Sequence, residues 1–191
     1  MNIRVAGRVF ASLAVVGAAW LAGCSGSGQR ADASGKPAGE ATHDPAAHAQ
    51  GPMLKFAKRL VGDWQSKGPD GQERLALRTH AMAAGTAVCE TMFPGSPHEM
   101  VNMYHLDGEK LVMTHYCAAG NQPRLEASSI EGNSVELKMR DVTNKLSPDE
   151  GYMGYLKITF VDDDHLIEEW KNYGGGKEQG TVKFEYTRVK G

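Results

Sequence analysis

Short segments of alternating hydrophobic and polar residues make up most of the chain after residue 62. Alternation with a period of two is typical of β-strands that bury one face, and turn residues separate the segments. Asp107-Gly108 and Gly132-Asn133 are strong signals for hairpin turns. The pattern predicts strands over residues 62–67, 73–83, 86–93, 98–106, 110–117, 123–130, 134–142, 152–161, 165–173 and 180–189.

One helical segment precedes these strands. Pro52 suits the first turn of a helix, and Gly62 suits the exit from it. Between them, Met53, Phe56 and Leu60 fall at the spacing of one apolar helix face. The sequence therefore predicts one short helix directly before the first strand.

The number and spacing of the strands predict the fold class. About ten strands with short sequential connections indicate a meander, and a meander of this length has to close because open edges invite aggregation. We expect an all-β domain over residues 52–191, folded as a single up-and-down antiparallel β-barrel of about eight to ten strands. The short N-terminal helix should lie near one mouth of the barrel.

The first residues have the layout of a secretory signal. Arg4 and Arg8 form a positive start, and no charged residue follows until after Gly23. The uncharged run is short for a bilayer core of about 30 Å, which takes ~20 apolar residues. Residues 1–23 are therefore predicted to be a cleaved signal peptide.

The residues that close this run, from Leu21 to Cys24, read Leu-Ala-Gly-Cys and resemble the bacterial lipobox. The resemblance implies cleavage before Cys24 and lipidation of its thiol, which makes the lipid bilayer a partner. It also implies an exported protein anchored to the cell envelope. In a Gram-negative cell, Ser25 in place of Asp would favour the periplasmic side of the outer membrane.

The segment after the lipid site is built differently from the domain. Residues 24–51 consist mostly of Ala, Gly, Ser, Pro and scattered charge, so we expect a disordered linker. The whole chain has a formal net charge of -2, and loss of the two signal arginines makes it more acidic. An acidic chain without a basic run argues against nucleic acid as a partner, and we expect none.

Gly62-Asp63-Trp64 at the first strand and Arg188 near the end of the last strand resemble the lipocalin pattern of the calycin superfamily. The resemblance implies that the indole covers one barrel end and that the guanidinium stacks on it. Residues 114–124 are also similar to a segment of uncharacterised bacterial lipocalin-like proteins. No other lipocalin motif is present.

Hairpin parity predicts which side chains point into the barrel, because residues two apart on a strand share a face. Pairing Phe93 near His98 puts Cys89 and Phe93 on the inner face of their strand. The inner faces defined in this way are mostly apolar, and they hold six polar side chains: Asn102, Tyr104, His115, Arg124, Glu126 and Glu168.

An apolar cavity with a few polar groups is typical of a small-ligand pocket. We therefore predict a binding module for a small, partly apolar ligand whose polar head is held by Arg124 or His115. In the alternative, side chains fill the barrel and Arg124 pairs with Glu126 or Asp141 at the rim. Another alternative is a barrel that uses His115 to ligate haem, as in the similar-sized barrel nitrobindin, or to convert a small molecule. A third is an envelope-interaction lipoprotein that uses the outer barrel face.

The other chemistry-bearing residues suggest neither a metal site nor an enzyme. The histidines lack compact metal-ligand spacing, and no nucleophile elbow or phosphate loop is present. His115 and Cys117 share a predicted face, but their Cα atoms are expected ~6.5–7 Å apart, and a catalytic pair also needs a third group to orient the base. Export favours a disulfide between Cys89 and Cys117. Their expected separation of ~9.5 Å opposes one, so both states remain open.

Overall fold

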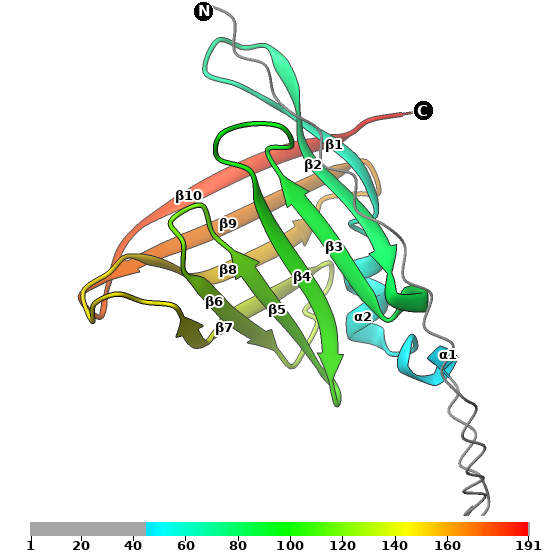
Figure 1. Ribbon diagram of the computed structural model, residues 1–191. Helices are drawn as coiled ribbons and strands as arrows, with labels where there is room; N and C mark the ends of the chain where they lie inside the picture. Colours follow the sequence, from blue (N-terminus) through cyan, green and yellow to red (C-terminus); the bar gives the residue numbers. More distant parts are fainter. Residues whose placement is uncertain (1–44, 191) are drawn as a thin grey trace, which may run out of the picture. The chain divides into compact units, whose positions relative to one another are not determined.

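The computed structural model describes residues 45–190 (Figure 1). The predicted signal peptide, the lipidation site Cys24 and most of the linker lie outside the described residues. Within the linker range, one short helix is described, α1 (Pro45–His48). The second helix, α2 (Pro52–Lys58), is the one that the sequence predicts, and it ends before Gly62. A short 3-10 turn, η1 (Ala83–Gly85), is the remaining helical segment described.

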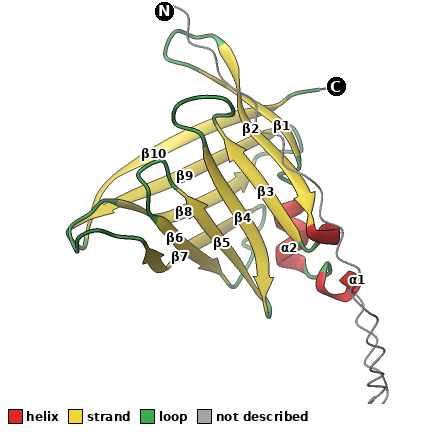
Figure 2. Ribbon diagram, in the orientation of Figure 1, coloured by secondary structure: helices red, strands yellow, loops and turns green. Residues whose placement is uncertain are grey.

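Ten strands form one closed antiparallel barrel in the described part of the chain (Figure 2). Each strand pairs with the next, and the first pairs with the last, which confirms the predicted fold class. The strands are β1 (Gly62–Lys67), β2 (Glu73–Met82), β3 (Ala87–Met92), β4 (Met100–Asp107), β5 (Lys110–Tyr116), β6 (Gln122–Ala127), β7 (Ser134–Thr143), β8 (Tyr152–Phe160), β9 (His165–Gly174) and β10 (Lys177–Arg188).

Helix α2 closes one end of the barrel (Figure 1). Its apolar residues Met53, Leu54 and Phe56 are buried, and the Phe56 ring lies edge-on to Phe160 at 5.3 Å between ring centroids. The surrounding strands contribute further buried aliphatic side chains at this end, including Leu111 and Ile158. This half of the barrel is therefore filled by its own side chains.

Trp64 and Arg188 join α2 to the barrel at the closed end. Trp64 is fully buried, and its Nε1 donates a hydrogen bond to the Leu60 carbonyl at 2.7 Å. The Arg188 guanidinium lies 4.0 Å from the centre of the indole, which confirms the predicted stack. Arg188 Nη1 also donates to the Val61 carbonyl at 2.7 Å, and Nη2 to the Arg59 carbonyl at 2.9 Å.

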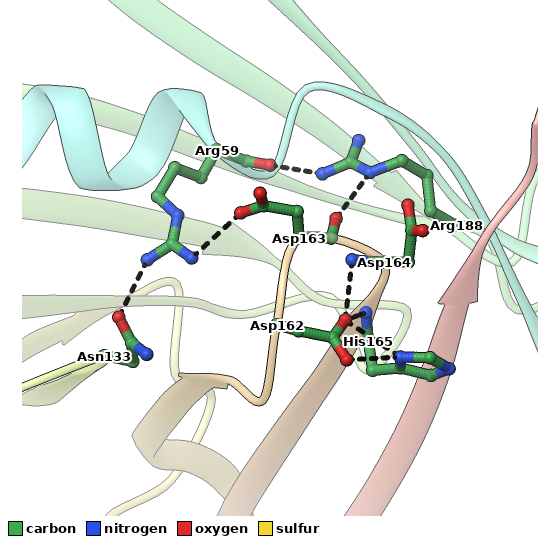
Figure 3. A network of polar contacts seen from close by, with 7 residues as sticks. All are labelled: Arg59, Asn133, Asp162, Asp163, Asp164, His165 and Arg188. Carbon is green, nitrogen blue, oxygen red and sulfur yellow. Dashed lines mark hydrogen bonds and ion pairs between the residues drawn. The ribbon is translucent and has the colours of Figure 1, made fainter.

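The turn between β8 and β9 is tied into the same end (Figure 3). Arg188 Nε donates to the Asp163 carbonyl at 2.9 Å, and Arg59 forms an ion pair with the Asp163 carboxylate at 3.6 Å. Within the turn, His165 and its backbone contact the Asp162 carboxylate. These contacts fix the closed end, so a ligand would have to reach the interior from the opposite end.

Candidate functional site

Three neighbouring strands bring polar side chains into one row inside the barrel. Glu90 on β3 pairs with Asn102 on β4, and Asn102 pairs with His115 on β5. Each of the three is at most 1% exposed. Directly paired residues on one sheet face have Cβ atoms ~4.5–5.5 Å apart, so these side chains lie within contact distance.

Asn102 is the centre of this row. Its Nδ2 donates to Glu90 Oε1 at 2.6 Å, and its Oδ1 lies 2.6 Å from His115 Nδ1. Because the amide nitrogen is the donor to Glu90, the amide oxygen is the acceptor and His115 Nδ1 carries the proton. This tautomer leaves a lone pair on His115 Nε2. Tyr104 completes the group by donating from its hydroxyl to Glu90 Oε1 at 3.2 Å.

A second buried carboxyl, that of Glu168, lies on β9, and its partners come from β9 and β10. Glu168 is fully buried, and its Oε2 accepts a hydrogen bond from Trp170 Nε1 at 2.9 Å and from the Tyr186 hydroxyl at 3.5 Å. The Trp170 ring lies 5.0 Å from the His115 ring between centroids. The two polar groups are thus connected across the barrel by these rings.

Burial decides the charge state of the interior. Desolvation raises the pKa of Glu90, and it raises the pKa of Glu168 well above the usual range, with the Glu90 carboxyl adding to the effect. Desolvation lowers the pKa of His115 to about 4. At neutral pH, we therefore expect a protonated Glu168, a Glu90 that is partly protonated because its pKa is raised to about 7, and a neutral His115 imidazole.

Three buried polar atoms in these groups have no hydrogen-bond partner among the described residues: Glu90 Oε2, His115 Nε2 and Glu168 Oε1. A buried polar group without a partner costs ~1–3 kcal/mol, and such groups are rare in folded proteins. Their concentration around one part of the interior marks it as the strongest candidate site.

A small pocket lies at the barrel end opposite α2 and has a volume of about 140 Å³. A cavity of about 150 Å³ holds one benzene molecule, so this pocket suits an occupant of one ring or smaller. Two of its lining residues, His115 and Trp170, are hydrogen-bonded to the buried polar residues Asn102 and Glu168, respectively. Its lining consists of Met92, Phe93, Met100, His115, Cys117, Met153, Trp170, Val182 and Phe184.

Larger hollows lie on the outer surface and differ in chemistry. One of about 650 Å³ is bordered by charged side chains such as Lys67, Lys183 and Glu185. It includes none of the residues with unpartnered buried atoms. The small pocket above His115 is therefore the better candidate for specific binding, although its volume is lower.

The structure places Asn102, Tyr104, His115 and Glu168 inside the barrel, as hairpin parity predicts. Their part in ligand binding stays a prediction. Glu90 is the site residue that sequence reasoning misses. Glu90 shares a strand face with the apolar Val88 and Met92, and this alternation could have indicated that it points inward. The predicted register instead put the odd-numbered residues of β3 inside.

That register was wrong by one residue. Met92 pairs with Met100, so Val88, Glu90 and Met92 face inward and Cys89 faces outward. Phe93 has a positive φ of 51°, which ends the regular strand before the connection to β4 begins. A shift of one residue reverses every side chain of a strand, so the prediction was wrong for Cys89 and Thr91, whereas Phe93, just beyond the end of β3, does line the inner pocket.

The predicted interior positions of Arg124 and Glu126 were also wrong. Arg124 lies on the outer face, where its Nε donates to Asp141 Oδ1 at 2.6 Å, and Glu126 accepts from Lys110 Nζ at 2.7 Å. The cause lies in the connection between β6 and β7: Glu126 pairs with Lys138, so β6 is one residue out of phase with the prediction. Leu125 and Ala127 face inward instead, and burial alternates without interruption along β6.

The cysteines of the described chain are not bonded to each other. Cys89 and Cys117 are both free thiols, and they belong to opposite faces of the sheet. The alternative of a disulfide is thereby excluded for this structure. Among residues 45–190, no three side chains of His, Cys, Asp or Glu gather closely enough to hold a metal ion.

No model of a known protein family matches the chain, and no curated protein matches its sequence. The closed antiparallel barrel with its Trp64–Arg188 stack is compatible with a lipocalin-like fold of the calycin superfamily. Because a fold of this kind hosts many functions, the site geometry has to carry any functional conclusion.

Proposed function

We propose that this protein is a membrane-anchored lipoprotein of the cell envelope whose barrel binds a small, partly apolar ligand. The observation that carries the binding proposal is the apolar pocket of about 140 Å³ that adjoins the His115 imidazole, whose Nε2 has no hydrogen-bond partner among the described residues. Apolar walls with few polar groups are the usual composition of a small-ligand site.

The chemistry of the pocket narrows the ligand. Its volume suits one ring or a short branched chain, and the aromatic rings of Phe93 and Phe184 suit an apolar body. A neutral His115 accepts a hydrogen bond at Nε2, so the ligand should carry one donor such as a hydroxyl. Arg124 lies outside, and no lining residue is a permanent cation, so a neutral ligand is favoured over an anion.

The binding proposal is tested with phenol as a probe on the full chain. We expect saturable binding by calorimetry and a higher thermal midpoint, because a ligand that binds only the folded state stabilises it. Val182→Trp puts an indole into the pocket mouth and should weaken phenol binding at least tenfold.

The matched control is Thr181→Trp, which adds the same side chain to the exposed face of the same strand. This variant should bind phenol as the parent does. Equal binding by both variants would place phenol elsewhere and contradict the proposal. Failure of phenol and similar one-ring probes to bind the parent would contradict it directly.

The anchoring proposal rests on the lipobox-like residues Leu21 to Cys24 and on no described contact. Within residues 45–190, neither helix is long and apolar enough to cross a bilayer. Cells that express the chain should incorporate a clickable fatty acid into it, and Cys24→Ala should abolish the label and release the protein from membranes. Cys89→Ala should leave both unchanged, and a labelled Cys24→Ala chain would rule out this anchor.

Haem ligation by His115 is less well supported than a small ligand. A pocket of about 140 Å³ is below the ~300–1,000 Å³ of sites for drug-sized molecules, and haem is larger than most of those. Haem binding would thus require the open end to widen.

A further inference from the structure

Sulfur-bearing side chains are concentrated in the pocket above His115. Four of its lining residues carry sulfur: Met92, Met100, Cys117 and Met153. The whole chain has nine methionines and three cysteines, so a third of each lies around one small volume. Apolar packing alone would be served equally well by leucine or valine.

Strand register arranges three of these residues in a row. Met92 pairs with Met100 across β3 and β4. Val101 pairs with Tyr116, which puts Cys117 next to Met100 on the following strand. Neighbouring Cβ atoms in such a row are ~4.5–5.5 Å apart, and the flexible methionine side chain lets its thioether adjust toward a common point.

Asn102 holds a thioether and the imidazole at the same time. Its Nδ2 lies 3.4 Å from Met92 Sδ, and its Oδ1 lies 2.6 Å from His115 Nδ1. A histidine that binds a metal usually donates its other ring N–H to a neighbouring acceptor, which fixes the ring. His115 has this arrangement, and its Nε2 is buried without a partner among the described residues.

The ligand types determine which ion fits. Thioethers and thiolates are soft ligands that select Cu(I), and a neutral imidazole also binds copper, whereas Ca²⁺ and Mg²⁺ require oxygen ligands. We infer that the pocket binds one soft monovalent ion, Cu(I), through Met92, Met100 and Cys117, with His115 Nε2 as the nitrogen ligand.

The binding step balances without a redox reaction. The Cys117 S–H bond is replaced by a S–Cu bond, and the thiol proton is released to the solvent. The thiolate charge neutralises the ion, which suits the apolar walls of the pocket. The inference goes beyond the proposed function, because it depends on the sulfur and imidazole groups rather than on the volume of the pocket.

The test is an anaerobic titration of the reduced full chain with Cu(I) in competition with bicinchoninate, with Ag(I) as a probe that does not change oxidation state. The parent should bind one ion per chain and release one proton. The double variant Met92→Leu/Met100→Leu conserves side-chain volume, so it should fold, and it should bind Cu(I) at least tenfold more weakly. Cys117→Ala should abolish the proton release.

Met82→Leu/Met103→Leu is the matched control, because these methionines do not line the pocket. It should bind Cu(I) as the parent does. Unchanged affinity in Met92→Leu/Met100→Leu, or equal affinity for Zn²⁺, would overturn the inference. Phenol binding by that variant separates the two proposals, since a pocket lined by leucine should still hold phenol after the metal site is lost.

Discussion

At the scale of single residues, the feature that distinguishes this barrel is a pair of buried carboxyls. Glu90 and Glu168 are both fully buried, and neither forms an ion pair in the described chain. Each keeps one oxygen hydrogen-bonded while the other has no partner. Such groups are destabilising unless they stay protonated, and this makes stability depend on pH.

Glu168→Gln tests this dependence. The pKa of Glu168 is raised in the folded state, whereas in the unfolded state it is about 4.3. Above that pH, the carboxyl of Glu168 is ionised in the unfolded chain and still protonated in the folded chain. Stability of the parent should therefore fall as pH rises from 5 to 8, by up to about 1.4 kcal/mol per pH unit from this group. Glutamine has nearly the same shape and does not titrate, so the stability of Glu168→Gln relative to the parent should increase over this range in urea unfolding.

The pKa of His115 is shifted in the opposite direction, and its effect on stability cancels when Glu168→Gln is compared with the parent. Its lowered pKa destabilises the fold as pH falls below about 6.5, but it does so in parent and variant alike. Glu185→Gln is the control on the adjacent strand. Lys183 lowers the pKa of the exposed Glu185, so this substitution should show no growing advantage above pH 5. A parallel pH profile for Glu168→Gln and the parent would mean that Glu168 is ionised inside the fold.

At the scale of elements, the closed end is held by a clamp between α2, β1 and β10. Arg188 covers Trp64 and donates to two carbonyls of the chain that leaves α2. Gly62 makes this approach possible. It has a φ of +127°, and a Cβ at this position would lie 2.7 Å from Arg188 Nη1.

Gly62→Ala should therefore destabilise the fold by about 1–3 kcal/mol, through backbone strain and displacement of the guanidinium. Chemical denaturation of the full chain measures the loss. Gly180→Ala on β10 is the control, since its Cβ would meet nothing within 4 Å and its φ is not positive. Equal stability of the two variants would show that the clamp tolerates a side chain at Gly62.

The elements also show how far sequence reasoning reaches. The alternation of apolar residues and the turn signals predict nearly every strand, because burial of one face imposes that pattern. Side-chain direction was predicted wrongly on β3, which ends at the positive φ of Phe93, and on β6, whose pairing with β7 is displaced by one residue. Such irregularities depend on contacts between distant residues, so Glu90 was missed and Arg124 was misplaced.

At the scale of the whole molecule, the two ends of the barrel differ in packing and in the chemistry of their side chains. The α2 end is filled and cross-linked by polar contacts, whereas the opposite end retains a small pocket with soft and aromatic side chains. This asymmetry favours binding from one direction only. It also explains why both proposals, phenol-like ligand and Cu(I), converge on the same residues around His115.

The buried carboxyls have a consequence for the molecule as an electrolyte. The formal charge of -2 counts every Glu as ionised, but Glu168 keeps its proton at neutral pH, and Glu90, whose pKa desolvation raises to about 7, keeps part of one. The folded protein should thus focus at a higher pH than its composition implies, and unfolding in urea should lower that isoelectric pH. Titration of the native chain up to neutral pH would then fall between one and two equivalents short of its carboxyl content until the barrel opens.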